Sequence, residues 1–382
     1  MNEVSPESFM KFFEELPDPR RDSGNMRHKL IDIIIIAISG VLAGSDGWDE
    51  IEYYGECKEA WFRKFLDLPN GIPSHDTFAR VFRLISPEEL KKCFINWVKS
   101  ISTIKNGEIV SIDGKSVRHS FDSFEGKSPI HVVSAWAKSC NLVLGQVKVD
   151  EKSNEITAIP ELLDLIDVKG CTVTIDAMGC QKEIAKKIIS KEADYLLALK
   201  GNQGTLHKDV QLFLDDCINN DFKDISHDFY ETFDKDHGRI EKRKYWITDN
   251  IKWLNQAGDW SKLTSIGVVE STREIGDKKT TERRYYITSK SKNAKDFEKA
   301  VRGHWAIENS LHWVLDIAFN EDNCRKRKDY SAENFAMLRH IALNLLKNEK
   351  TVKLGIKGKR KVVGWDPDYL IKLFTAGINN SV

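Results

Sequence analysis

The sequence lacks several features that would assign it quickly to a class of protein. Its 382 residues carry 58 basic and 58 acidic side chains, so net charge gives no reason to propose a nucleic-acid partner. Its seven cysteines show no C-x-x-C spacing, which disfavours a disulfide framework and a structural zinc site. It has no P-loop, no G-x-S-x-G elbow and no G-x-G-x-x-G segment after a strand, which removes three large enzyme classes.

Long apolar runs are also scarce. The first residues, M-N-E-V-S-P-E, are acidic where a signal peptide would be basic, so we expect no signal peptide. The run from Leu30 to Ala43 is strongly apolar, but it contains Asp32 and is only about two-thirds of a membrane span. We therefore expect a buried core helix there, no membrane association and a cytoplasmic protein.

The N-terminal part of the chain has a helical pattern. Apolar residues recur at helical spacing from Trp48 to Leu66, and Ser74 is placed to cap a helix through Arg83 after a Gly/Pro turn. Ser86 precedes a further helix with proline at its first position. Such helices are typical of generic packing or of a helix-turn-helix. We predict an all-helical N-terminal domain at 1–102.

Beyond residue 107 the periodicity changes to that of strands. Three strands are followed by helix, strand, helix and strand, which indicates a mixed sheet covered by helices. We predict an α/β fold with an RNase H-like mixed sheet flanked by helices, because that sheet has this order. The strands are predicted at 108–117, 130–137, 142–149, 171–177 and 195–200, and the helices at 156–166 and 181–191.

A β-rich insertion then interrupts this pattern. It begins with a helix to about residue 217 and continues with alternating segments at 229–247, 263–270 and 281–287, before an amphipathic helix at 295–319. The predicted domains after the N-terminal one are the catalytic core, first part, at 103–203, the insertion at 204–290, the core, second part, at 291–350, and a basic C-terminal tail at 351–382.

Two strands end in the same kind of five-residue pattern, V-S-I-D-G at 110–114 and V-T-I-D-A at 173–177. Each places an aspartate, Asp113 or Asp176, at the end of a strand and on one face with the hydroxyl residue two positions earlier. On parallel neighbouring strands the two carboxylates would repel each other unless a cation lay between them. Such oxygen ligands suit Mg²⁺. The alternative is that each aspartate caps the loop after its strand.

Glu308 is the third candidate. It falls on one helical stripe with Val301 and Leu315, so we expect its carboxylate to face the core, where a charge needs a partner or a metal. His304 and His312, four residues away on either side, could supply hydrogen bonds. A Glu-His-His zinc site on this helix is a further option, which the missing H-E-x-x-H arrangement disfavours. Two Asp and one Glu around two Mg²⁺ ions suit phosphodiester chemistry.

Several motifs in one order resemble those of the insertion-sequence transposases that include the H-repeat-associated proteins. The resemblance covers nearly the whole chain and includes P-D-P-R-R at 17–21, His28 and N-E-D at 320–322. The main motifs are S-I-D-G-K-S at 111–116, T-I-D-A-M-G-C-Q at 174–181, L-K-G-N-Q at 199–203, H-G-R-I-E-K-R at 237–243 and R-G-H-W-A-I-E-N-S-L-H-W at 302–313. The related Y-R-E-K signature is present only in part.

The resemblance implies a bacterial DDE transposase that cleaves DNA at the terminal inverted repeats of its element and joins the ends to target DNA. It implies that Asp113, Asp176 and Glu308 form the triad and hold Mg²⁺, with Mn²⁺ as a substitute. It further implies double-stranded DNA as partner, a homodimer or larger synaptic assembly, and association with the nucleoid.

Other residues are candidates for contacts with DNA. Turn residues after the strand at 195–200 could reach a phosphate or form an ordinary polar turn, and basic residues of the insertion could do so or form a solvated strand face. Two tryptophans near Glu308 could stack on bases or belong to the core, and the basic segment 353–361 could be a DNA-backbone arm or a linker. The candidates are Lys200, Asn202, Gln203, His237, Arg239, Lys242, Arg243, Arg302, His304, Trp305, His312, Trp313, Lys357, Lys359, Arg360 and Lys361.

Two other functions remain open at this point. A structure-selective nuclease could use the same fold and carboxylates, but it would not need the helical first hundred residues. A domesticated DNA-binding protein would have lost catalysis, and loss of a triad residue would have indicated it.

Overall fold

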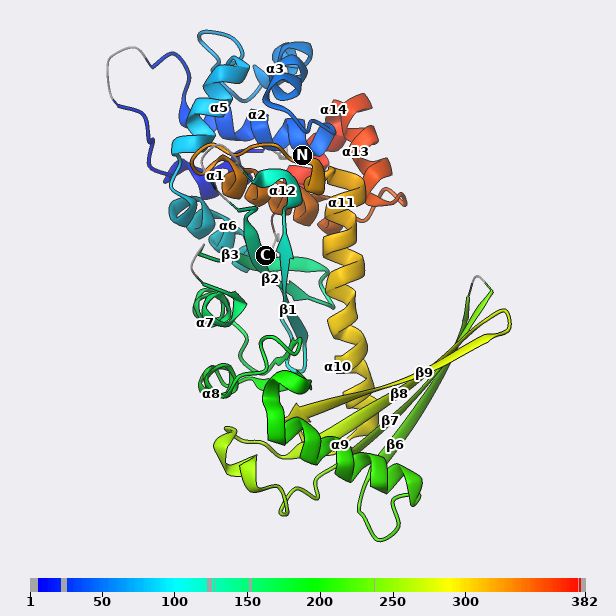
Figure 1. Cartoon of the computed structure of the whole chain (residues 1–382). Coiled ribbons are helices and arrows are strands. Elements are labelled where there is room, and N and C mark those ends of the chain that lie inside the picture. Colours follow the sequence, from blue (N-terminus) through cyan, green and yellow to red (C-terminus); the bar gives the residue numbers. More distant parts are fainter. Residues whose placement is uncertain are drawn as a thin grey trace. The chain divides into compact units, whose positions relative to one another are not determined.

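The computed structural model describes residues 6–21, 26–121, 126, 128–150, 153–236, 238–376 and 378, so His237 lies outside the described residues. The fold is mixed α/β, with nine strands in the order β3-β2-β1-β4-β5-β9-β8-β7-β6 and many helices (Figure 1). The strands are β1 (Ile109–Ser116), β2 (His131–Ala137), β3 (Leu142–Lys148), β4 (Thr172–Ile175), β5 (Asp194–Leu199), β6 (Asp228–Asp236), β7 (Arg239–Thr248), β8 (Ser265–Ile275) and β9 (Lys278–Thr288).

The helices account for most of the rest of the described chain. They are α1 (Glu7–Glu14), α2 (Leu30–Ala43), α3 (Trp48–Cys57), α4 (Glu59–Phe62), α5 (His75–Leu84), α6 (Pro87–Ile101), α7 (Glu155–Leu165), α8 (Lys182–Ser190), α9 (Gly204–Asn219), α10 (Ala294–Ile307), α11 (Trp313–Phe319), α12 (Ser331–Asn348), α13 (Ile356–Trp365) and α14 (Pro367–Ala376). The chain divides into two compact units. The first comprises Met1–Thr103, Gly114–Glu151 and Glu308–Val382, and the second comprises Ile104–Asp113 and Lys152–Ile307.

Parallel strands form the centre of the second unit. β1 pairs with β4 and β4 with β5, each pair parallel, with Ser111 opposite Thr174 and Ile112 opposite Ile175. Every residue of β4 is buried, as expected for a parallel strand covered on both faces. The predicted parallel neighbourhood of the two V-x-I-D strands is therefore confirmed.

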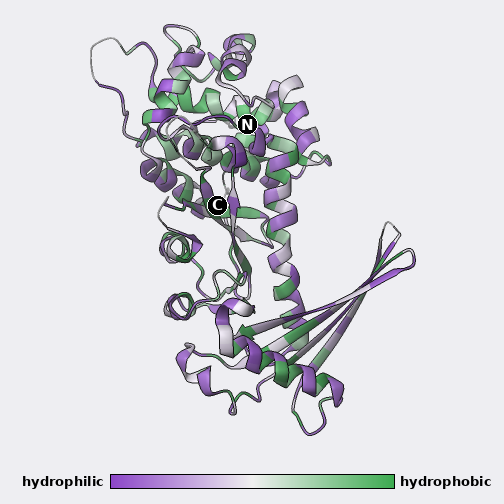
Figure 2. Cartoon of the chain, in the orientation of Figure 1, coloured by the Kyte–Doolittle hydropathy of each residue, from purple (hydrophilic) through white to green (hydrophobic). Residues whose placement is uncertain are grey.

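Four later strands, within the predicted insertion at 204–290, extend this sheet in the second unit. β9 pairs antiparallel with β5, and β8, β7 and β6 follow as antiparallel neighbours. The predicted segment at 229–247 is a hairpin of two strands, because Gly238 takes a positive φ of 74° at its turn. Near β5 the strands pack against Phe297 and Val301 of α10, whereas the far ends of β8 and β9 are exposed and hydrophilic (Figure 2).

Helix α2 is the core of the first unit. Twelve of its 14 residues are buried, and it packs against α12 and α13, so the predicted core helix is confirmed. Asp32 is 2% exposed, and burial raises the pKa of its carboxyl to about 6. Among the described residues, no single helix is long and apolar enough to cross a bilayer; α2 and α3 meet that test only together, bent by 96°.

The C-terminal basic segment differs from the prediction of a DNA-backbone arm. It forms α13, and Lys359 and Arg360 are each only 6% exposed. Arg360 donates through Nη2 to the Val41 carbonyl at 2.7 Å and through Nη1 to the Ala318 carbonyl. The prediction is wrong for these two residues, because their charged groups already bind carbonyl and carboxylate oxygens within the first unit. Lys357 and Lys361 are exposed.

We predict that Arg360→Met lowers the free energy of unfolding by about 3 kcal/mol, because it removes the buried guanidinium bonds to the Val41 and Ala318 carbonyls and leaves the Val41 carbonyl with only the Gly44 amide. Urea titration followed by circular dichroism measures this change. The neighbouring exposed Lys361→Met is the matched control and changes stability by at most about 0.5 kcal/mol. Equal stabilities for the two variants would show that Arg360 does not hold α2 and α11.

Candidate active site

A buried set of hydrogen bonds joins β1, β4 and the last turn of α10. Ser111 Oγ donates to the Gly303 carbonyl at 3.1 Å, Thr174 Oγ1 donates to Ser111 Oγ at 3.1 Å, and Thr174 Oγ1 lies 3.2 Å from His304 Nδ1. Both hydroxyl side chains are at most 1% exposed. Burying them without partners would cost about 1–3 kcal/mol each, so these bonds specify where α10 lies. We call these four residues the hydroxyl layer.

Gly303 permits the close approach of α10 to β1. A Cβ atom at this position would lie 2.7 Å from Cγ2 of Ile109, which is closer than real Cβ contacts. Gly303 is the glycine of the R-G-H-W motif, and a larger residue at this position would clash with Ile109. The helix that leads to Glu308 is thus held by one carbonyl bond and one close contact.

Asp113 and Asp176 follow the hydroxyl layer by two residues on their strands. Both side chains are partly exposed. Asp176 comes directly after β4, as predicted, but β1 continues to Ser116, so Asp113 lies within its strand and not at its end. The last paired residues are Ile112 and Ile175, so the two aspartates are next in register.

The loop after Asp176 is fixed by polar side chains. Asp176 Oδ1 accepts hydrogen bonds from the backbone amides of Met178 at 2.9 Å and Gly179 at 3.3 Å. Asn202 Nδ2 donates to the Ala177 carbonyl at 2.7 Å, and Gln203 Nε2 donates to the Cys180 carbonyl at 2.6 Å. Asp176 Oδ1 therefore caps the loop after its strand, which was the alternative to metal binding for this oxygen. The side-chain amides of Asn202 and Gln203 hold the same loop.

Glu308 opens a five-residue π-helical turn, Glu308–His312, between α10 and α11. Its side chain is 52% exposed, so the prediction that it faces the core is wrong. The helical-stripe argument assumed one α-helix from 295 to 319, and a π turn changes the direction of the side chains within it. Val301, Leu315 and Phe319 of the same stripe are buried as predicted.

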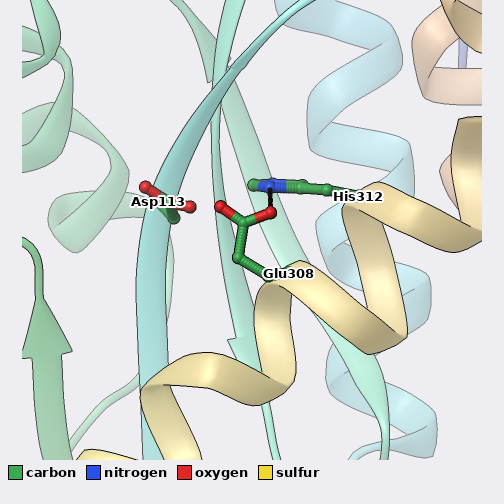
Figure 3. A group of neighbouring side chains, drawn as sticks. All are labelled: Asp113, Glu308 and His312. Atoms are coloured by element: carbon green, nitrogen blue, oxygen red, sulfur yellow. Dashed lines mark ion pairs between the residues drawn. The ribbon is translucent and has the colours of Figure 1, made fainter. Parts of the chain in front are cut away.

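Asp113, Glu308 and His312 form a group of potential metal ligands. Each offers one ligand atom, and these atoms lie within 4.8 Å of one another. Figure 3 shows Asp113 on its strand and the Glu308 carboxylate turned toward the His312 ring, with 3.4 Å between Oε2 and Nδ1. Two carboxylates and an imidazole can bind a divalent cation. The group contains two of the predicted triad residues and His312 in place of Asp176.

An ionic cluster of buried and half-buried side chains lies in the first unit. The Lys115 ammonium lies 2.7 Å from Asp316, 2.9 Å from Asp322 and 3.5 Å from Glu321, and Glu321 lies 3.9 Å from Arg339. Burial opposes the charge of Lys115, but the three carboxylates together raise its pKa above the ordinary value. The cluster fixes the N-E-D segment to the strand residue two positions after Asp113. The S-I-D-G-K-S and N-E-D motifs could be identified in the sequence, but nothing there indicated that Lys115 of the first binds the acidic residues of the second.

The predicted DNA contacts differ in their surroundings. Lys200 and Arg302 are exposed. Arg243 is 13% exposed and bound to Asp234 and Glu241, so its charge is already paired within the hairpin, and Arg239 and Lys242 also pair with glutamates. His304 belongs to the hydroxyl layer and His312 is 5% exposed.

The two tryptophans near Glu308 do not belong to the core. Trp305 is 40% exposed, with the Arg284 guanidinium 4.9 Å from its ring centroid, and Trp313 is 61% exposed. An exposed aromatic face can stack on a base or on a planar cation.

Comparison with protein families decides the identity of the chain. Residues 105–345 match the transposase DDE domain, and residues 10–98 match the DDE_Tnp_1-associated family. The chain belongs to the DDE transposase family. This DDE-family chain is 42% identical over 366 residues to the H repeat-associated putative transposase YhhI of Escherichia coli K12, covering 94% of this chain and 96% of YhhI. It is 44% identical over 372 residues to the putative transposase YncI of Escherichia coli O157:H7, covering 96% and 94%.

Two weaker likenesses also exist. The inactive transposase YbfQ of Escherichia coli K12 is 40% identical to this DDE-family chain over 72 residues, which is 19% of this chain and 84% of YbfQ. The cryo-EM structure of the piggyBac transposase synaptic complex with hairpin DNA aligns with a TM-score of 0.46 and 12% identity, over 95% of this chain and 80% of that one. That structural likeness is too low to carry an argument.

We predict that Gly303→Ala destabilises the chain although alanine favours a helix. The gain in helix propensity of about 1 kcal/mol is smaller than the cost of pushing α10 away from Ile109, roughly 1–3 kcal/mol. Gly201→Ala is the matched control, because nothing lies within 4 Å of a Cβ there. Chemical denaturation of both variants provides the measurement. A Gly303→Ala variant as stable as the wild type would mean that the close approach is not required.

We predict a pH-dependent loss of stability from His340. The ring is 3% exposed, and burial, assisted by nearby His312 and Arg339, lowers its pKa to about 3. Below about pH 6.5 the unfolded chain binds a proton that the folded chain excludes, so stability falls as the pH drops toward 3, by up to about 1.4 kcal/mol per unit. Urea midpoints at pH 7, 6 and 5 should fall less steeply for His340→Leu than for the wild type. Exposed His227→Leu is the control, and equal slopes for His340→Leu and wild type contradict the prediction.

Proposed function

We propose that this chain binds the terminal inverted repeats of its insertion sequence, cleaves phosphodiester bonds there and transfers the freed 3′ ends to target DNA. Asp113, Asp176 and Glu308 are the proposed catalytic carboxylates. The family implies DNA cleavage and transposition, and the proposal assigns that chemistry to specific residues.

One geometric relation carries the proposal. Two residues along a strand span roughly 6.6 Å, and four residues along a helix span roughly 6 Å. The hydroxyl layer brings Ser111, Thr174 and His304 together. Asp113 and Asp176 each come two residues after the hydroxyl residue of their strand, and Glu308 comes four residues after His304. A layer of hydroxyl and imidazole groups would thus be followed by a layer of carboxylates. The carboxylate layer is our inference from that spacing.

The donor set suits a divalent cation. Asp113, Asp176 and Glu308 would hold Mg²⁺ through carboxylate oxygens, with Mn²⁺ as a substitute that also accepts imidazole. A divalent ion there would activate water or a 3′-hydroxyl and stabilise the leaving oxygen. Asp176 has Oδ2 for such a role, because the loop amides use Oδ1. His312 positions the Glu308 carboxylate, 3.4 Å away.

The sheet order supports an RNase H-like core. The part β3-β2-β1-β4-β5 begins with three consecutive strands and ends with parallel strands, and the insertion strands extend it from β5. We propose the corresponding functional division: recognition at 1–102, catalysis at 103–203 and 291–350, an insertion at 204–290 and a C-terminal segment at 351–382.

Double-stranded DNA is the proposed partner, because the ends of the element and the target must meet at the carboxylates. Exposed Lys200 and Arg302 would contact the backbone, and Trp305 and Trp313 would stack on bases. Cutting two ends together calls for a homodimer or a larger synaptic assembly. We place the protein at the nucleoid in the bacterial cytoplasm.

We predict that Asp113→Asn, Asp176→Asn and Glu308→Gln each reduce metal-dependent nicking by about a hundredfold or more, because each removes a charged ligand of the cation. The assay uses a labelled duplex with the element's terminal repeats and Mg²⁺ or Mn²⁺. Asp167→Asn, an exposed carboxylate outside the site, is the matched control and cuts like the wild type.

Each alternative gives its own result. Nicking without preference for the repeat ends would favour a structure-selective nuclease. Binding of the ends by a wild type that cuts nothing would favour a domesticated DNA-binding protein. Variants at Asp113, Asp176 and Glu308 that cut as well as the wild type would overturn the assignment of the site.

A further inference from the structure

A cavity of about 810 Å³ lies in the first unit, lined by residues 19–21 and 26–28, the turn near residue 70 and helix α5. Four arginines line it: Arg20, Arg21, Arg27 and Arg80. Among the described residues, the lining contains no aspartate or glutamate. The cavity therefore concentrates positive charge in a chain whose net charge is zero.

Three of these arginines differ from the paired arginines elsewhere in the described part of the chain. Arg21, Arg27 and Arg80 are exposed, and within the described part of the chain no carboxylate lies within ion-pair distance of them. By contrast, the arginines of the β6–β7 hairpin are paired with acidic neighbours. Three guanidinium groups thus remain available for an external anion.

Arg20 has a structural role in the same cavity. Its Nε and Nη2 donate to the Asp18 carboxylate at 2.9 and 2.6 Å, and Nη2 also donates to the His28 carbonyl at 2.8 Å. Asn70 Nδ2 donates to the Arg27 carbonyl at 2.6 Å. These bonds fix the backbone at Arg20 and at Arg27–His28, next to Arg21 and at Arg27.

Hydroxyl groups complete the cavity wall. Ser74 precedes α5 without capping it through its side chain, and its Oγ lies 3.2 Å from Oγ1 of Thr77. Thr77 and Arg80 are three residues apart on α5 and so neighbour each other on its surface, and both line the cavity together with Ser74. Arginine and hydroxyl side chains are the common protein partners of DNA phosphates.

We propose that this arginine cavity binds the phosphate backbone of duplex DNA. The inference rests on the proposed function and adds a binding site outside the carboxylates. The forked guanidinium of arginine matches two oxygens of one phosphate, and three such groups can engage consecutive phosphates. The volume is also far larger than a single free phosphate ion requires, which favours a segment of backbone.

The surroundings of His28 agree with a site prepared for an anion. Burial is the main reason that the pKa of His28 lies below its ordinary value, and the positive charges of Arg20 and Arg27 lower it further. A bound phosphate would offset those charges. The His28 pKa should therefore rise when DNA binds.

The test is fluorescence anisotropy of a fluorescein-labelled, mixed-sequence duplex of about 30 base pairs, titrated with the full-length chain in EDTA at several salt concentrations. The triple variant Arg21→Gln, Arg27→Gln, Arg80→Gln should bind roughly 10- to 100-fold more weakly near physiological salt. The slope of log K against log salt should decrease by roughly 2–3, because each phosphate that the protein no longer neutralises lowers the slope by about 0.9.

A second triple variant separates a local site from bulk charge. Lys11→Gln, Lys64→Gln and Lys99→Gln remove the same charge from exposed positions outside the cavity, and they should leave affinity and salt slope close to those of the wild type. Thermal melting by circular dichroism confirms that both variants fold. Equally weakened binding in the two variants, an unchanged arginine triple or a wild type that does not bind the duplex would overturn the inference.

The chelator keeps this test independent of the carboxylates. Duplex binding is measured without free divalent metal and does not require cleavage, so a failure of the proposed cleavage would leave duplex binding intact. A failure of the arginine cavity would instead leave binding unchanged in the arginine variant. In a parallel arm, inorganic phosphate replaces chloride at equal ionic strength; displacement of the duplex at low millimolar phosphate would assign the cavity to a small anion and overturn the DNA assignment.

Discussion

The hydrogen bonds among Ser111, Thr174, Gly303 and His304 hold helix α10 against two parallel strands. They are formed in the interior, where an unpaired hydroxyl would be costly, so the helix has one favourable position along the strands. The polar face of each V-x-I-D strand therefore has two tasks, since its hydroxyl fixes the helix and its aspartate follows by two residues. The apolar face of the same strands meanwhile belongs to the core.

Much of this arrangement could be predicted from the sequence, because it depends on local periodicity. The strand and helix positions between 108 and 200 agree with the structure within a few residues, and so does the parallel pairing. The exposure of Glu308 could not be predicted, because a π turn follows from tertiary packing and not from apolar spacing. The burial of Arg360 could not be predicted either, because the carbonyl oxygens that it binds lie on helices far away in sequence.

Charge shows the same limit. A net charge of zero conceals a local excess around Arg21, Arg27 and Arg80, because the third arginine lies more than fifty residues from the others in sequence. Conversely, the basic H-G-R-I-E-K-R segment seemed suited to phosphate, but Arg243 pairs with Asp234 on the neighbouring strand, and Arg239 pairs with Glu241 on its own strand. Strand register, which the composition of a segment does not reveal, decides whether a basic residue is available.

The pairing of β9 with β5 makes strands β6–β9 part of the same sheet as β1, β4 and β5. Without residues 204–290, β5 would present an open edge of unpaired amides and carbonyls, which invites pairing with other chains. Modular exchange of this insertion between related proteins is therefore constrained at one strand: a replacement must bring its own partner for β5. The loops and the distal hairpin ends carry no such constraint, and they are where sequence drift and new specificity can accumulate without unravelling the sheet.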